Sequence, residues 1–141
     1  MSDTQPDACT VQYIDHVGIA VRDLEAALKL FQEVFQVSPG EIKELPEQGV
    51  RATLLPVGQT RLELLQPLSA DSPIGRFLER RGEGLHHLAF HIDNIAEKLR
   101  ILSARGLQLV DKEPRPGLSG IIAFVHPSSV HGILTELVQT P

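Results

Sequence analysis

The chain has 141 residues, of which 42% are hydrophobic and 22% are charged. This length fits one compact domain or two fused half-size modules, and it excludes a large multidomain assembly. The 18 acidic and 13 basic residues give a formal net charge of −5, which argues against a surface that neutralises nucleic-acid phosphates. The single cysteine, Cys9, excludes an intrachain disulfide and a cysteine-rich zinc site.

Patterns typical of membrane spans and export signals are missing from the sequence. No apolar run approaches the roughly 20 residues of a membrane span, and the first residues carry neither a basic nor an apolar leader pattern. We therefore expect a cytoplasmic protein with no membrane and no nucleic-acid partner. Residues 1–11 are polar and unpatterned, so we expect a disordered lead followed by a single domain over residues 12–141.

The first half of the domain shows the pattern of a strand, a helix and a β-hairpin, and makes up a first module over about residues 12–68. Alternating and helical spacings of apolar residues, an Asp in N-cap position and a Pro/Gly turn carry this prediction. The predicted elements are a strand over residues 13–21, a helix capped by Asp23, and a hairpin of strands 50–55 and 61–66 around residues 56–59.

A short connecting helix within residues 71–82 follows, because Ser72 and Pro73 occupy the N-cap and first-turn positions that these residue types favour. The second module, about residues 84–139, repeats the plan of the first. Its predicted elements are a strand over residues 85–92, a helix over 94–103, and strands over 121–125 and 133–138.

Superposing His16 on His87, 71 residues later, places the two helices in register and reveals an internal duplication. Glu63 then follows His16 by 47 residues, and Glu136 follows His87 by 49 residues. Each module thus has a histidine near the start of its first strand and a glutamate in its last strand. The spacing predicts an α+β fold of two βαβββ modules.

If a pseudo-twofold axis relates the modules, the side chains of His16, Glu63, His87 and Glu136 meet in one cluster. Two neutral imidazoles and two carboxylates suit a divalent ion of the first transition series and leave coordination positions open. Taken singly, each residue also fits a satisfied strand histidine or a solvated glutamate. The repetition of both residue types at nearly the same offset favours a metal site.

The remaining histidines fit this site less well. Strand alternation predicts that His86 points to the face opposite His87, and His91 lies about 13 Å further along the strand, too far for the same ion. His126 and His131 flank a turn, and we expect them to have surface or turn roles.

Six segments of the chain resemble the vicinal oxygen chelate superfamily (glyoxalase/bleomycin-resistance/dioxygenase) and, within it, the methylmalonyl-CoA epimerase family. The resemblance covers about residues 13–138. The segments that carry it are Asp15–Val21, Pro46–Val50, Leu62–Leu68, Asp71–Ile74, Gly82–Phe90 and the pair Glu136-Leu137.

The resemblance implies an eight-stranded, metal-holding cavity and an isomerase that interconverts the two epimers of methylmalonyl-CoA through an enolate. It implies the four residues of the repeated pattern as metal ligands, with Co²⁺ as the first expectation and Mn²⁺, Ni²⁺, Fe²⁺, Zn²⁺ or Mg²⁺ as others. It also implies Glu47 as a catalytic carboxylate. Proton delivery from the opposite face needs a second acid, for which we consider Glu136.

The helix that begins after Ser72 can receive an anion at its exposed N–H groups. We therefore expect the acyl-CoA substrate to contact Ser72, Ile74 and Arg76. Isolated βαβββ modules leave sheet edges open, and members of the superfamily are commonly dimeric, so we expect a homodimer.

Two other functions remain open at this point. One is a lactoylglutathione lyase-like metal enzyme, which also moves a proton beside a carbonyl group. The other is a metal-free drug-binding protein of the bleomycin-resistance type, although the 4% aromatic content offers few rings for such a cleft. Departures from the family pattern at Ser119, Ser128 and His131 concern the choice of acyl group.

Overall fold

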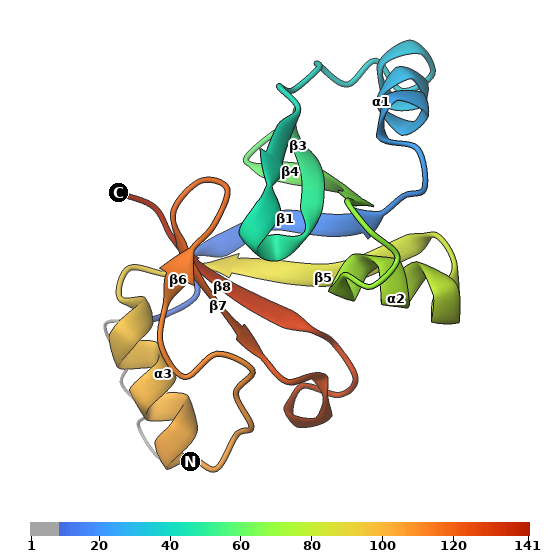
Figure 1. Ribbon diagram of the computed structural model, residues 1–141. Coiled ribbons are helices and arrows are strands. Elements are labelled where there is room, and N and C mark those ends of the chain that lie inside the picture. The colour runs from blue at the N-terminus through green and yellow to red at the C-terminus, as the bar shows by residue number, and fades with distance from the viewer. Residues whose placement is uncertain (1–8) are drawn as a thin grey trace. The chain divides into compact units, whose positions relative to one another are not determined.

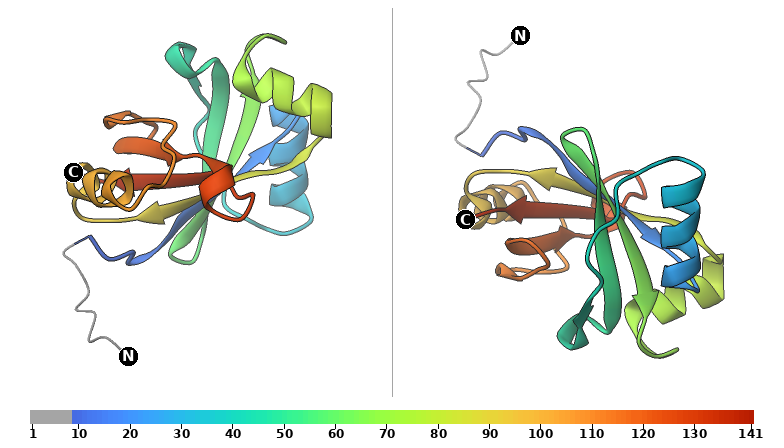
Figure 2. Two further views of the ribbon diagram at one scale, coloured as in Figure 1. Left: turned by 90° about the horizontal axis from the view of Figure 1, so that it is seen from below. Right: turned by 90° about the horizontal axis from the view of Figure 1, so that it is seen from above.

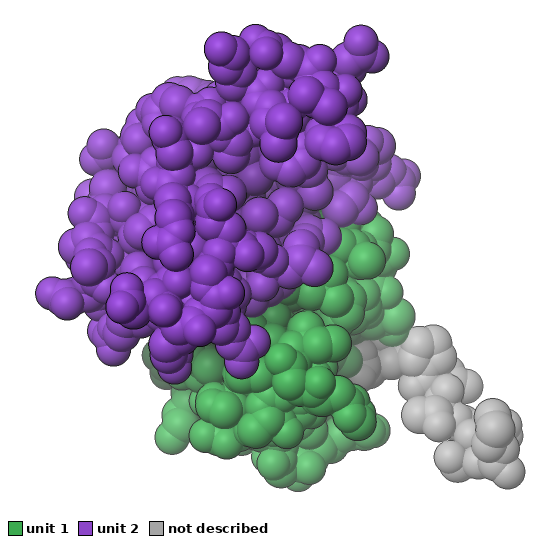
Figure 3. Space-filling view, turned by 90° about the vertical axis from the view of Figure 1, so that its right-hand side faces the viewer, with its two compact units in different colours: residues 1–15, 88–141 green, residues 16–87 purple. Residues whose placement is uncertain are grey.

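The computed structural model describes residues 9–141, which fall into two compact units (Figure 3). Unit 2 consists of His16–His87, and unit 1 combines the N-terminal segment up to Asp15 with Leu88–Pro141. The elements in chain order (Figure 1) are β1 (Tyr13–Ala20), α1 (Leu24–Glu33), β2 (Lys43–Leu45), the 3₁₀ turn η1 (Pro46–Gln48), β3 (Val50–Val57), β4 (Thr60–Pro67), α2 (Pro73–Arg81), β5 (Gly84–His91), α3 (Ile95–Ala104), β6 (Arg115–Pro116), β7 (Ile121–Val125), the 3₁₀ turn η2 (Pro127–Ser129) and β8 (Thr135–Gln139).

Strands β1 and β5 each contribute residues to both units. Within unit 2 the hydrogen-bonded order is β2-β3-β4-β1-β5, and within unit 1 it is β1-β5-β8-β7-β6. In both units the first strand of a module runs parallel to the last strand of the same module: β1 with β4, and β5 with β8. The boundaries of the compact units therefore fall inside strands and differ from those of the two sequence modules.

The core of unit 2 forms because α1 places its apolar residues against one face of the sheet. Leu24 and Leu28 of the helix pack with Leu55 of β3 and Leu64 of β4. Figure 2 shows α1 beside the strands of this unit. The opposite faces of β1 and β4 carry His16 and Glu63, so this packing leaves those side chains to the other side of the sheet.

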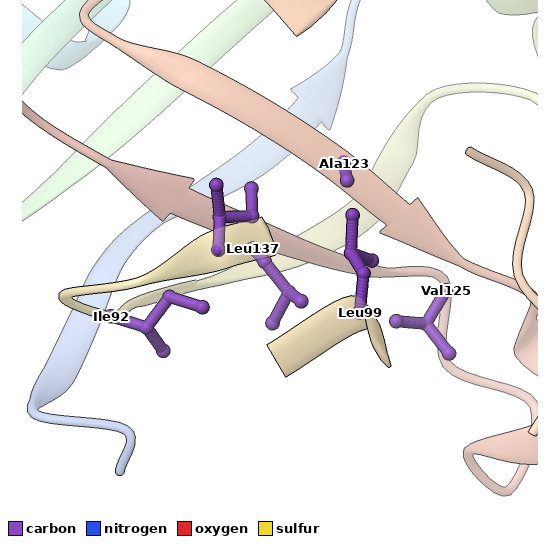
Figure 4. Packing of buried hydrophobic residues seen from close by; sticks show 6 residues of the cluster. Ile92, Leu99, Ala123, Val125 and Leu137 are labelled. Carbon is purple, nitrogen blue, oxygen red and sulfur yellow. The ribbon is translucent and has the colours of Figure 1, made fainter. Parts of the chain in front are cut away.

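The core of unit 1 repeats this arrangement with α3 in the place of α1. Ile92, Leu99, Ala123, Val125 and Leu137 point toward one another in Figure 4, and all are buried. Burying such side chains contributes about 1.5–3 kcal/mol each for the larger ones. Each unit therefore has its own hydrophobic core between one helix and its strands.

Equivalent N-caps, an aspartate and an asparagine, begin helices α1 and α3. The Asp23 carboxylate accepts a hydrogen bond from the backbone N–H of Ala26 (3.1 Å), and the Asn94 side-chain carbonyl accepts one from the N–H of Glu97 (3.1 Å). Both caps stand where the sequence pattern predicts the helices to start. Such caps stabilise a helix by about 1 kcal/mol.

A glutamine from the last strand of each module completes the helix starts. The Gln66 side chain accepts from the N–H of Leu24 and the Gln139 side chain accepts from the N–H of Ile95, both at 2.8 Å. Each bond ties the first turn of a helix to the strand that carries the predicted glutamate ligand. The duplication predicted from the sequence thus extends to individual hydrogen bonds.

Several boundaries differ from the predicted ones. The short elements β2, η1 and β6 were not predicted, because segments of two or three residues show no periodicity, whereas η2 lies in the turn predicted between His126 and His131. Strand β8 begins at Thr135 rather than at residue 133, because the Ile133 N–H closes a turn onto the Val130 carbonyl.

Of the predicted disordered lead over residues 1–11, the structure describes residues 9–11. Residues 1–8 lie outside the described residues, but Cys9 is fully buried. The backbone N–H of Gln12 donates to the carbonyl of His91 (3.0 Å). The ordered chain therefore starts before the first strand.

No helix between residues 9 and 141 combines the length and the hydropathy that a membrane span needs.

Candidate metal centre

Three strands of unit 2 bring His16, Glu63 and His87 together. The Nε2 atoms of the two imidazoles lie 3.1 Å apart. The Glu63 Oε1 atom lies 3.5 Å from Nε2 of His16 and 3.2 Å from Nε2 of His87. Three predicted ligands thus present their donor atoms to a common point.

Strand register explains the meeting of these side chains. Gly18 of β1 is paired with Glu63 of parallel strand β4, and His16 lies two residues before Gly18, on the same face of the strand. His87, on β5, approaches from the other side of β1. The site is therefore set by strand positions rather than by a loop.

Gly18 provides the space that the His87 ring occupies. A Cβ atom built on Gly18 would lie 2.1 Å from Cε1 and 2.3 Å from Nδ1 of His87, far inside van der Waals contact. The ring thus lies directly against the backbone of β1. Any residue other than glycine at position 18 would displace it.

The donor set fits a divalent cation. His16, Glu63 and His87 are exposed by 4%, 7% and 6%, and a buried carboxylate is costly unless it is paired or binds a metal. Two imidazole nitrogens and one carboxylate oxygen are the ligand types that first-row divalent ions accept. The three atoms lie within 4.8 Å of one another, the spacing expected of ligands around one ion.

The fourth predicted ligand, Glu136, lies on β8 in unit 1. Its Cα is paired with Ala89 of parallel β5 and with Phe124 of antiparallel β7, and only 4% of the residue is exposed. It occupies the same position in its module as Glu63 does in the first, in the last strand and paired with that module's first strand. A buried glutamate at this position meets the expectation for a ligand, and its role stays a prediction.

Glu47 lies in η1, immediately after β2, and is exposed. Pro46 begins this turn, and Gly49 ends it in the left-handed conformation with φ of 69°, which favours glycine. The Gly49 carbonyl accepts a hydrogen bond from the N–H of Leu68 (2.8 Å). The backbone on both sides of Glu47 is therefore held in place.

The same glycine brings the Glu47 segment next to the predicted substrate-binding helix. A Cβ atom on Gly49 would lie 2.9 Å from Cβ of Ser72. The Ser72 hydroxyl accepts from the N–H of Gly75 (3.1 Å) and donates to the carbonyl of Ser69 (2.7 Å). Ser72 is thus the N-cap of α2, as predicted, and is buried.

The other predicted substrate contacts lie in the first turn of α2. Ile74 is 4% exposed and packs in the interior of unit 2. Arg76 is exposed, and its Nε donates to the backbone carbonyl of Asp71 (2.9 Å). Of the three residues, Arg76 is the one whose side chain reaches solvent.

The prediction that His86 points to the face opposite His87 concerns the strand faces, but the rings of the two histidines still meet. The Nδ1 atom of His86 lies 2.8 Å from Nδ1 of His87. Strand alternation fixes the direction of the Cα–Cβ bond but not the position of a ring atom two bonds further out, so neighbouring imidazoles can still meet. Sequence reasoning missed this contact; the signal was the His-His pair itself.

The other histidines have roles outside the cluster. His91 is buried between Gln12 (2.8 Å to Nδ1) and Thr140 (3.0 Å to Nε2), and its ring stacks on Tyr13. The Nδ1 atom of His126 accepts from the N–H of Ser128 (3.0 Å) and so caps η2. His126 thus has the turn role expected from the sequence, and His91 makes its contacts outside the cluster.

Comparisons with known proteins agree with this architecture. The model of the Glyoxalase/Bleomycin resistance protein/Dioxygenase superfamily matches residues 15–124. The mitochondrial methylmalonyl-CoA epimerase of Bos taurus is 38% identical over 128 residues, which cover 89% of this chain and 73% of the relative. The ethylmalonyl-CoA/methylmalonyl-CoA epimerase of Cereibacter sphaeroides is 36% identical over 129 residues, covering 89% and 96% of the two chains.

A solved structure with the same fold is a variant of Streptomyces coelicolor methylmalonyl-CoA epimerase in complex with 2-nitronate-propionyl-CoA. It superposes with a TM-score of 0.89 at 35% sequence identity and covers 93% of this chain and 96% of its own. The predicted fold of paired βαβββ modules is thereby confirmed.

Proposed function

Because the chain belongs to the Glyoxalase/Bleomycin resistance protein/Dioxygenase superfamily, we propose that it is an isomerase of this superfamily, a methylmalonyl-CoA epimerase. Its reaction interconverts (2R)- and (2S)-methylmalonyl-CoA. The observation that carries the proposal is the buried His16–Glu63–His87 cluster, in a chain 38% identical to a named epimerase.

The reaction removes a weakly acidic proton from the carbon between a thioester and a carboxylate, and negative charge develops on the thioester oxygen. A divalent ion bound in the cluster would supply Lewis-acid stabilisation of that charge. His16, Glu63 and His87 would hold the ion, with Glu136 as a fourth ligand and Co²⁺ as the first candidate metal. The strand positions of these residues fix their geometry before substrate arrives.

Glu47 is the proposed base. Its carboxylate is exposed and therefore accessible to a ligand, while Pro46 and Gly49 restrain the backbone that carries it. Restraint matters because proton transfer by a positioned side chain contributes about 10²–10⁴-fold. Glu136 is the proposed second acid, and in this role it would have to combine metal ligation with carrying the proton that returns to the opposite face of the planar intermediate.

The first turn of α2 is the proposed contact for the acyl-CoA. Ser72 and Ile74 are buried and would act by fixing the helix start next to Gly49, while Arg76 would reach the substrate directly. This arrangement would place the base segment and the anion-binding end of a helix on the same substrate.

We further propose a homodimer that acts in the cytoplasm, on a small-molecule acyl-CoA and without a nucleic-acid partner. The net charge of −5 supports the last point. One relative is named for both ethylmalonyl-CoA and methylmalonyl-CoA, so both acyl groups belong in a substrate comparison.

The test mixes metal-loaded protein with (2S)-methylmalonyl-CoA in D₂O and follows α-deuterium incorporation together with formation of the (2R) epimer. A chelated sample serves as the control. We expect exchange and epimerisation that both need metal. If only ethylmalonyl-CoA exchanged its α-proton, the substrate would be ethylmalonyl-CoA rather than methylmalonyl-CoA. Turnover of the methylglyoxal–glutathione adduct without exchange of either thioester would favour a lactoylglutathione lyase.

Failure to bind metal would instead favour the drug-binding class. Equilibrium dialysis of the chelated protein against Co²⁺ separates this outcome from an inactive but metal-bound enzyme. A bound metal without exchange of any malonyl thioester would retain the site and reject the reaction.

A further inference from the structure

His87 is held through both of its ring nitrogens. Its Nε2 faces Nε2 of His16 (3.1 Å) and Oε1 of Glu63 (3.2 Å). Its Nδ1 lies 2.8 Å from Nδ1 of the neighbouring His86. One ring nitrogen therefore faces the cluster, and the other faces His86, which has no role in the proposed function.

The chemistry of imidazole decides the direction of the His86–His87 hydrogen bond. A neutral ring carries one proton, on either Nδ1 or Nε2. If Nε2 of His87 is to offer its lone pair to an ion, the proton must be on Nδ1. That N–H then donates to Nδ1 of His86, which must accept with its own lone pair.

The surroundings of both rings restrict other arrangements. On one side, the backbone of Gly18 lies so close to the His87 ring that no Cβ would fit. On the other, the His86 ring meets the ring of Phe77 edge to face, with centroids 4.9 Å apart and planes at 84°. Phe77 lies on α2, so a helix supports the ring that accepts the hydrogen bond from His87.

We infer that His86 is a positioning residue: it selects the Nδ1-protonated form of His87 and orients its Nε2 toward the metal site. This inference rests on the proposed metal site and adds a residue to it. Groups that hydrogen-bond the second nitrogen of a ligand histidine fix its tautomer and orientation, and their loss typically lowers metal affinity about 10–100-fold.

Two variants separate the acceptor from the ring. His86→Phe keeps a ring that can still meet Phe77 edge to face, but it has no acceptor for the His87 N–H. His86→Asn loses the ring but carries a side-chain oxygen on Cγ, the atom that also bears Nδ1 in histidine. The matched control is His131→Asn, because His131 is exposed and has a φ of 52°, which asparagine tolerates.

Each protein is first freed of metal with a chelator and then titrated with Co²⁺ alone. The experiment records the dissociation constant and the visible absorption of the bound ion. We expect His86→Phe to bind Co²⁺ about 10–100-fold more weakly than the wild type, with an altered absorption spectrum. We expect His86→Asn to recover most of the affinity and His131→Asn to match the wild type.

Three outcomes would overturn the inference. Equal affinity of His86→Phe and the wild type would remove His86 from the site, while the metal site itself would stand. Equal loss in the Phe and Asn variants would show that the acceptor is not the cause. No Co²⁺ binding by the wild type would reject the metal site and, with it, the proposed function.

Discussion

The two sequence modules begin their helices in the same way but differ in the segment that follows. Asp23 and Asn94 cap the helices alike, and a glutamine from the last strand bonds each first turn. After α1 the chain forms β2 and the turn that holds Glu47. After α3 it forms the two-residue strand β6 and a turn in which the Gly117 N–H donates to the Gly120 carbonyl (2.7 Å). The strands and capped helices that both modules share position the candidate ligands. The segment that differs gives the first module a candidate base, Glu47.

The largest effect is expected at this difference. Glu47→Gln should lower kcat about 10²–10⁴-fold, because it removes the carboxylate that accepts the α-proton. Co²⁺ affinity should not change, since Glu47 lies outside the ligand set. The measurement is α-proton exchange in D₂O together with a Co²⁺ titration.

Glu113→Gln is the matched control for that variant. Glu113 is an exposed carboxylate in the corresponding segment of the second module, just before β6, and its substitution should leave kcat within about two-fold of the wild type, as expected for a residue outside the site. If both variants lost activity equally, the two segments would not differ in the way we propose.

A second contrast concerns Gly18 and Ala89, which occupy the same position in the first strand of each module. Gly18→Ala should weaken Co²⁺ binding by about 10-fold or more, because the new Cβ displaces the His87 ring. It should also cost about 1–3 kcal/mol in the free energy of unfolding, as overpacking does. Urea unfolding and Co²⁺ titration measure the two effects.

Ala89→Gly is the reciprocal change. It should cost only about 0.5–1 kcal/mol, the penalty for glycine within a strand. Ala89 is fully buried, so a loss of similar size in both variants would indicate general sensitivity of the strand rather than a clash with His87.

The helix caps should behave alike. Asp23→Ala and Asn94→Ala should each lower the free energy of unfolding by about 1 kcal/mol, because each removes the acceptor for one N–H of the first helical turn. Urea unfolding of both variants and of the double variant measures this. If the losses in unfolding free energy of the two single variants differed by more than about 0.5 kcal/mol, the two helix starts would not be equivalent.

The smallest effect is expected from the ion pair that ties α1 to β3. The Arg51 guanidinium bonds to the Glu25 carboxylate (2.6 and 3.2 Å) and holds the pKa of that carboxyl below its ordinary value of 4.5. The contribution is present above pH 4.5 and is lost as the pH falls through the lowered pKa. Glu25→Gln should therefore reduce the loss of stability on acidification.

Unfolding measured in urea between pH 3 and pH 7 tests this, and added salt should diminish the difference because the pair is exposed. The counterpart in α3 joins Glu97 and Arg100 within one helix. An unchanged pH profile in Glu25→Gln would show that the α1 pair adds nothing to stability.

The repeated elements and residues could be predicted from sequence because the same pattern of residues occurs in both modules. Branched residues, an Asx cap and a strand glutamate recur in order, so His16, Glu63 and His87 could be selected before any distance was known. The meeting of His16, Glu63 and His87 then follows from strand register, which alternation along a strand constrains.

What could not be predicted depends on contacts between residues without a sequence period. Strand β2 has three residues and is extended only because it pairs with β3. Cys9 is fully buried although it lies outside every periodic segment. The His86–His87 bond depends on ring torsions, and the approach of Gly49 to Ser72 depends on how a loop meets a helix.

The sharing of β1 and β5 between the compact units has a consequence for folding. A fragment ending near residue 70 would lack the β5 residues that complete unit 2, and the remaining fragment would lack the β1 residues that complete unit 1. Neither module can therefore finish a sheet by itself. Such pairing between strands distant in sequence slows folding, and it predicts that the two halves acquire structure in a single cooperative transition, with separated fragments recovering it only when mixed.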